Sequence, residues 1–194
     1  MTVQTTLCLS QIAEYQWEQV RSDGRMRQLV DPLMSFVMRD ESTFRKMMRS
    51  DPELMEPLRD AWELSKRMTQ ALVAEGVRLL PGTDLPWITQ GLSLHEELRL
   101  FVDEIGIQPL DALRSATIHA AEYQGESGKA GQIAPGQRSD LVILDRDPLL
   151  DIRAVASIDT VMIGRYVLGR EARESGIARV IKCYNAMPVP ATAG

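Results

Sequence analysis

The stretch Gly76-Val-Arg-Leu-Leu-Pro-Gly-Thr-Asp84 decides the fold that we predict for this chain. Its apolar centre, Val77–Leu80, is typical of a short buried strand, and Pro81-Gly82 ends that strand. One carboxylate, Asp84, therefore follows the C-terminal end of the strand. Enzymes built as barrels of parallel strands keep their chemistry at that end. Asp84 is for this reason the first candidate functional residue.

Two amphipathic segments flank the predicted strand. Pro57–Glu75 repeats apolar residues at helical spacing, and Gly76 suits the position just after a helix. Ser93–Ile105 has the same spacing, and Ser93 with Glu96 predicts a capping box at its start. Helix, glycine, strand, loop and helix in this order predict a β/α unit, and so an α/β fold class.

The remaining segments before Gly125 are predicted from local signals. Thr5–Leu9 is a short β-prone run, and Gln11–Val20 is predicted to be helical. Two or three short helices are expected between residues 25 and 60. Pro109 suits the start of a further helix, which should end near Tyr123.

After Gly125 the pattern changes from helical spacing to short apolar runs separated by glycines. Leu141–Leu144 and Thr160–Ile163 are predicted strands, and Gly164-Arg165 is the two-residue turn of a hairpin. This texture predicts a small β module rather than another β/α unit. A peripheral helix is expected from Ala172 onward.

Composition limits the partners and the compartment. The chain has 194 residues, of which 44% are hydrophobic, 25% charged and 5% aromatic, as is typical of soluble globular proteins. The net charge of -5 argues against a nucleic-acid partner. No apolar run reaches the roughly 20 residues of a membrane span, and Met1–Leu7 lacks the features of a signal peptide. Cys8 and Cys183 form no CxxC motif, which fits a cytoplasmic protein.

Several motifs in a fixed order resemble the C-terminal portion of the amidohydrolase superfamily, in particular its imidazolonepropionase-like and prolidase-like branch. They cover about residues 72–170, roughly half of the chain. The matching stretches are Gly76–Asp84, Leu94-His-Glu-Glu-Leu98, Pro109–Thr117, Gly131–Asp145, Asp147–Ile152 and Val161–Tyr166.

The resemblance implies the C-terminal part of a (β/α)8 barrel together with the C-terminal share of a small β-sandwich. Val77–Leu80 would be the eighth barrel strand, and Thr5–Leu9, by position only, the strand before it. On this basis residues 1–124 form a partial β/α barrel segment. Residues 125–170 form a small β-sandwich segment, and residues 171–194 form a peripheral helix and tail.

The resemblance also implies metal-assisted chemistry, with Asp84 as a metal ligand and as the base that takes a proton from the attacking water. The complete family uses a divalent metal, with zinc expected first. A catalytic zinc needs about three protein ligands. The family's His-x-His pair, later histidines and carboxylated lysine have no counterpart here, because the only histidines are His95 and His119. The isolated chain is therefore expected to hold no stoichiometric metal.

Each candidate residue also has a plainer interpretation. Asp84 could cap the turn before Pro86, since Asp is common at caps and turns. Trp87 and His95 are the candidate substrate-binding residues, because ligand sites favour aromatic walls and the loop after the last strand lines the mouth of such a site. His95 could equally be a structural residue of a helix, and His119 is predicted to be structural.

Two function classes remain open at this stage. The first is an amidohydrolase-family hydrolase that acts on C–N bonds of small-molecule amides, cyclic amides or dipeptides and is incomplete as this chain. The second is a non-catalytic, truncated or degenerate relative. A few strands with unpaired edges and exposed apolar faces would in either case favour self-association.

Overall fold

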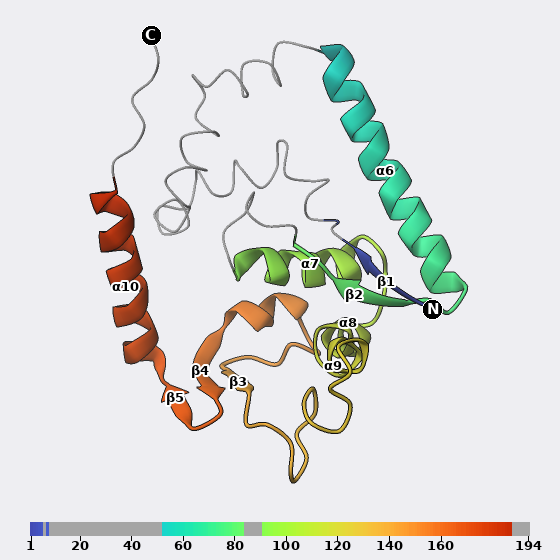
Figure 1. The fold of residues 1–194 in the computed structure, drawn as a ribbon. Helices are drawn as coiled ribbons and strands as arrows, with labels where there is room; N and C mark the ends of the chain where they lie inside the picture. The colour runs from blue at the N-terminus through green and yellow to red at the C-terminus, as the bar shows by residue number, and fades with distance from the viewer. Residues whose placement is uncertain (6, 8–51, 84–90, 188–194) are drawn as a thin grey trace.

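The computed structural model describes residues 1–5, 7, 52–83 and 91–187, and shows a mixed α/β protein (Figure 1). The predicted helices Gln11–Val20 and most of the region 25–60 lie outside these residues. The elements in chain order are β1 (Thr2–Thr5), α6 (Pro52–Ala74), β2 (Arg78–Pro81), α7 (Leu92–Asp103), α8 (Pro109–Ala116), α9 (Ile118–Tyr123), β3 (Leu141–Leu144), η2 (Ile152–Ala156), β4 (Ile158–Ile163), β5 (Tyr166–Leu168) and α10 (Arg170–Ala186). None of the helices in these described ranges is long and apolar enough to cross a bilayer.

The first sheet is a parallel pair, β1 and β2, with Thr2 opposite Arg78 and Thr5 opposite Pro81. The strand predicted at Val77–Leu80 is confirmed with a shift of one residue. Of the strand predicted at Thr5–Leu9, Thr5 is the last residue of β1 and Leu7 is not in a strand, while Thr6, Cys8 and Leu9 lie outside the described residues. The prediction is therefore wrong at Leu7, whose N–H donates to Glu97 of α7 instead of to a strand.

The helix before β2 ends as its glycine predicts. Gly76 has φ +75°, which favours glycine, and its N–H donates to the carbonyl of Val73 at 2.9 Å. The N–H of Val77 donates to the carbonyl of Leu72 at 3.0 Å. These two bonds form a Schellman motif, which turns the chain directly from α6 into β2. The helix itself begins at Pro52, earlier than the predicted Pro57.

The predicted helix Ser93–Ile105 is found as α7, but its predicted capping box is wrong. The position before the helix is Gly91, with φ 85°, and no side chain caps the helix there. Glu96 instead accepts hydrogen bonds from the Arg99 guanidinium, one turn along, at 3.0 Å from Nε. The carboxylate that should reach back to the helix start is thus engaged in an i,i+3 pair on the helix surface.

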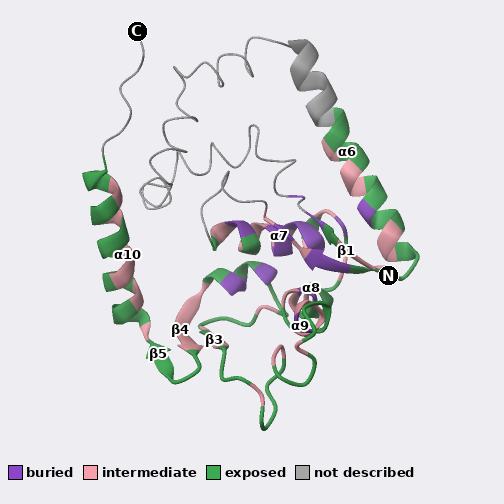
Figure 2. Ribbon diagram, viewed as in Figure 1, coloured by how far each residue is buried: buried purple, intermediate pink, exposed green. Residues whose placement is uncertain are grey.

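Helix α7 supplies the centre of the core (Figure 2). Its Phe101 and Leu100 have 0% exposed surface and are the largest fully buried apolar side chains among the described residues. The cluster of buried apolar residues around them is Leu7, Leu79, Leu98, Ile105, Ala112, Ile152 and Val155. One helix therefore packs against the parallel pair, against α8 and against η2.

The second sheet is antiparallel in the order β3-β4-β5 and is separate from the first. The predicted strands Leu141–Leu144 and Thr160–Ile163 are confirmed, with β4 two residues longer at its start. The predicted hairpin turn is also confirmed: Gly164 has φ 56°, and its N–H donates to Asp140 Oδ1 at 3.0 Å. Ile152, Ala154 and Val155 of η2, which lies between β3 and β4 in the chain, are buried.

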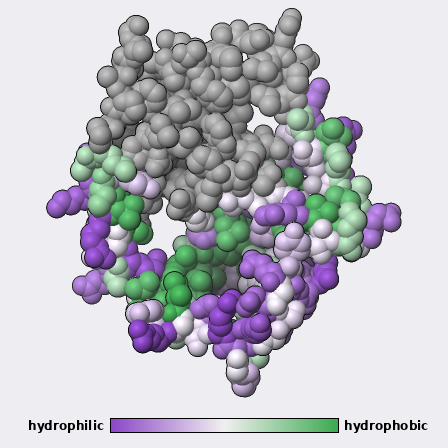
Figure 3. Space-filling view, in the orientation of Figure 1, coloured by the Kyte–Doolittle hydropathy of each residue, from purple (hydrophilic) through white to green (hydrophobic). Residues whose placement is uncertain are grey.

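The antiparallel sheet leaves apolar side chains exposed on both faces, since Ile143 and Val167 are 50% and 60% exposed on one of them. On the other face the register places Val142, Val161 and Leu168 in one row, and Ile163 with Tyr166 in a second row. Val142, Ile163 and Tyr166 are 55%, 56% and 60% exposed. Green, hydrophobic surface is visible over this part of the molecule in Figure 3. The predicted self-association, which stays a prediction, would use this face.

The single predicted helix from Pro109 to Tyr123 is divided in two at Thr117. That residue has φ -124° and ψ -93°, outside helical values, and separates α8 from α9. Its hydroxyl donates to the carbonyl of Leu113 at 2.7 Å. Such a bond from a Thr side chain to a carbonyl one turn back offers the backbone an alternative to the regular helix.

Gly131 holds the segment after α9 against that helix. It has φ +87°, and a Cβ placed there would lie 2.8 Å from the Ile118 Cα and 2.9 Å from the Thr117 carbonyl oxygen. Both atoms belong to the backbone, so neither can move aside cheaply. Gly136 has the same φ of +87° but no atom within 4 Å of such a Cβ. The two glycines therefore differ only in packing.

We expect Gly131→Ala to lower the free energy of unfolding by about 1–3 kcal/mol more than Gly136→Ala does, because overpacking adds to a shared backbone strain. Urea unfolding of both variants beside the wild-type chain measures this difference. Equal losses in the two variants would show that the close approach at α9 carries no energetic weight.

Candidate functional site

The candidate site lies where β1 and β2 end together. Because the two strands are parallel, Thr5 and Pro81 mark the same edge of the sheet. Gly82, which is buried, and Thr83, which is half-buried, follow β2 at this edge. Asp84 and Trp87 come next in the chain but lie outside the described residues, so their predicted roles stay predictions.

Helix α7 brings one polar residue, Glu97, to this edge and carries two more on its first half. Ser93 and Glu97 are buried and His95 is half-buried, all in the first half of the helix. Glu97 Oε1 accepts a hydrogen bond from Thr5 Oγ1 at 2.7 Å and another from the Leu7 N–H at 3.0 Å. The structure therefore joins the helix after β2 to the end of β1, across more than ninety residues of sequence.

Glu97 was not among the residues that the sequence singled out. The signal that could have found it is its position on the buried stripe of α7, three and four residues before Leu100 and Phe101. A carboxylate on an apolar stripe needs partners, because burying a charged group without hydrogen bonds is costly. The predicted capping box instead used the neighbouring Glu96 with Ser93, and Glu97 had no predicted role.

His95 is the one predicted substrate-binding residue that the structure describes. Its Nδ1 atom is buried and has no hydrogen-bond partner in the described part of the chain. Desolvation by burial lowers the pKa of the imidazole below its ordinary value. The ring is therefore neutral at pH 7, and a neutral imidazole can both donate and accept a hydrogen bond. His119, predicted to be structural, is half-buried on α9.

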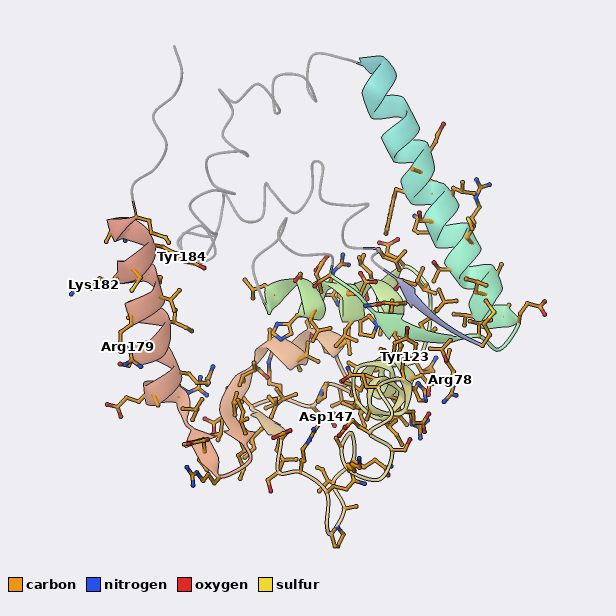
Figure 4. All side chains as sticks on the ribbon, in the orientation of Figure 1. Arg78, Tyr123, Asp147, Arg179, Lys182 and Tyr184 are labelled. Atoms are coloured by element: carbon orange, nitrogen blue, oxygen red, sulfur yellow. The ribbon has the colours of Figure 1, made fainter. Side chains whose placement is uncertain are left out.

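Three exposed basic residues, Arg78, Arg179 and Lys182, lie away from this edge (Figure 4). Arg78 lies at the opposite, N-terminal end of β2 (Figure 4) and pairs with Glu122 on α9 at 2.5 Å. The pair is exposed, and exposed ion pairs contribute little to stability. Arg179 and Lys182 lie on α10, well apart from the parallel strands in the same view. We therefore assign none of these groups to the site.

The described residues do not fit a complete metal centre. No group of three or more His, Cys, Asp or Glu side chains within them is placed to hold an ion. A catalytic zinc needs about three protein ligands. Glu97 Oε1 already accepts two hydrogen bonds, and His95 lies without a second histidine on α7.

Comparison with protein families and with curated proteins gives a consistent result. The model of the amidohydrolase family matches residues 42–176. Adenine deaminase from Gluconobacter oxydans is 41% identical over 64 residues, which make up 33% of this chain and 10% of that protein. Ochratoxinase from Aspergillus niger is 32% identical over 85 residues, 43% of this chain and 17% of that protein.

Solved structures agree with these matches. A prolidase in complex with N-methylphosphonate-L-proline has 26% identity and a TM-score of 0.52, over 73% of this chain and 34% of that one. The A. niger ochratoxinase structure has 24% identity and a TM-score of 0.54, over 61% of this chain and 28% of that one, and shows likeness of fold alone. The chain thus spans about a third of the length of these structures.

The burial of His95 predicts a pH dependence of stability. Because the pKa of His95 is lower in the folded chain, the unfolded chain binds a proton here at higher pH. The free energy of unfolding should therefore fall as the pH drops below about 6.5, the ordinary pKa of histidine. In His95→Gln the fall between about pH 7.5 and about pH 5.5 should be smaller than in the wild-type chain.

Urea unfolding at the two pH values measures this fall, and His95→Asn serves as a second variant that removes the same ring. An equal fall in the wild-type chain and in both variants would contradict the lowered pKa.

Proposed function

This chain belongs to the amidohydrolase family, and we propose that it carries the last-strand part of the site of a hydrolase that cleaves C–N bonds. The substrates would be small molecules of the amide, cyclic amide or dipeptide class. The relatives support a small-molecule substrate: one is named adenine deaminase, one ochratoxinase, and a prolidase was solved with N-methylphosphonate-L-proline.

The observation that carries the proposal is the edge formed by β1 and β2. The parallel strands end together at Thr5 and Pro81, and β2 continues through the buried Gly82 to Thr83, directly before Asp84. In barrel enzymes the groups that do chemistry follow the strands at this end. We accordingly propose that β2 is the eighth strand of such a barrel and β1 the strand before it.

Asp84 is the proposed base of the reaction. A carboxylate next to an attacking water can accept its proton and later pass it to the leaving nitrogen. Asp84 is also the proposed ligand of the divalent metal that this family generally uses, with zinc expected first. In a complete centre such a metal would supply a more acidic water for Asp84 to deprotonate. The neutral His95 and Trp87 are proposed to contact the substrate.

The domain division predicted above belongs to the same proposal. Residues 1–124 would form the barrel segment, residues 125–170 the sandwich segment and residues 171–194 the peripheral part. The change from a parallel pair to a separate antiparallel sheet supports this division. The face with Val142, Ile163 and Tyr166 is the kind of surface that a second sheet of a sandwich covers.

Weak metal binding tests Asp84 without requiring a complete metal centre. Mn²⁺ added to the chain should broaden the amide signals of Gly82 and Thr83, because these residues are within two positions of the proposed ligand. Paramagnetic broadening in a two-dimensional amide spectrum measures this effect. Asp84→Asn should remove it, since an amide is a much poorer ligand for a hard cation.

Asp111→Asn is the matched control, because it removes a carboxylate of the same kind on the exposed surface of α8 and should leave the broadening in place. Broadening that survives in Asp84→Asn, or that never occurs at Gly82 and Thr83, would favour the second class, a relative without the chemistry.

A further inference from the structure

Glu97 is the most completely buried charged side chain among the described residues, with 0% of its surface exposed. Its two donors are buried as well: Thr5 and Leu7 are 9% and 3% exposed. A buried carboxylate costs free energy that an apolar residue of similar size would not. Leu98, Leu100 and Phe101 show that α7 fills neighbouring positions with apolar residues. The carboxylate therefore calls for an explanation other than core packing.

The two donors to Glu97 lie at the end of β1. Thr5 is the last residue of β1, and Leu7 lies two residues beyond it. Both donate to the same oxygen, Glu97 Oε1, at 2.7 Å and 3.0 Å. One acceptor thus fixes the end of the strand and the backbone that leaves it.

The partner strand has no N–H at its last residue. Pro81 lies opposite Thr5 and cannot donate to β1. Among the described residues, α7 holds the end of β1 through Glu97.

We propose that Glu97 is a positioning residue of the candidate site: its carboxylate holds Thr5, the last residue of β1, and Leu7 level with Pro81, the last residue of β2, and with Gly82 and Thr83 after it. The edge matters for chemistry only if the proposed function is right, so this role rests on that function. The role proposed for Glu97 is positioning, because its Oε1 accepts both bonds from the end of β1.

Amide hydrogen exchange of the full chain, without metal, tests the positioning. Glu97→Leu removes the acceptor, so exchange at Leu7 should become about tenfold faster or more, the effect of losing one hydrogen bond. Exchange at Gly82 and Thr83 should also become faster, while the amides of α8 and α9 change little. Glu97→Gln keeps an oxygen acceptor and should stay close to the wild-type chain.

Thr5 provides a second pair of variants in case Glu97→Leu does not fold. Thr5→Val keeps the shape of the side chain but removes the hydroxyl donor, and Thr5→Ser keeps the donor. We expect faster exchange at Leu7, Gly82 and Thr83 in Thr5→Val only. A merely structural role would instead speed exchange at all core amides together, in proportion to lost stability, and that uniform pattern would overturn the proposal.

The response to Mn²⁺ separates this role from the proposed function. If both hold, broadening at Gly82 and Thr83 should weaken in Thr5→Val and stay in Thr5→Ser. Unchanged broadening in Thr5→Val would overturn the positioning of the site, while the role of Asp84 would stand. If the wild-type chain shows no broadening but the selective exchange pattern is present, the proposed function fails and Glu97 still holds the two strand ends together.

Discussion

The hydrogen bonds from the end of β1 to Glu97 are the interaction on which the described structure depends. They join Thr5, the last residue of β1, and Leu7 to a helix residue 92 and 90 positions away, at the end of β1 that lies opposite Pro81. A two-stranded parallel sheet is not stable by itself, because parallel strands need cover on their faces and several neighbours. Through Glu97, α7 hydrogen-bonds to the end of β1 in addition to packing against the sheet.

Helix α7 is for this reason the centre of the described fold. Phe101 and Leu100 pack among residues of β2, α8 and η2, so one helix buries apolar surface from every neighbouring element. Arg153 of η2 pairs with Asp103 at 2.5 Å and adds a polar contact at the far end of the helix. The family assignment rests on the family model that matches residues 42–176, and the candidate site lies where the end of β1 meets Glu97 of this helix.

The sequence predicted those features that depend on neighbouring residues. The cap at Gly76, the strand that becomes β2, the turn at Gly164 and the start of α8 at Pro109 each carry a local signal that the structure bears out. The end of β1 could not be predicted, because the Leu7 N–H beyond it donates to Glu97, which is distant in sequence. The use of Glu97 also depends on distant partners, and Glu96 beside it suggested a cap that is not formed. Asp84 and Trp87 lie outside the described residues, so their assignment still rests on sequence and family.

A double-mutant cycle between Thr5 and Glu97 is the most direct measurement of the central claim, that this contact joins the sheet to the helix. The free energies of unfolding are measured for the wild-type chain, Thr5→Val, Glu97→Leu and the double variant. A buried hydrogen bond to a carboxylate predicts a coupling free energy of about 1.5–3 kcal/mol between the two positions. A coupling near zero, with additive losses in the double variant, would contradict the account.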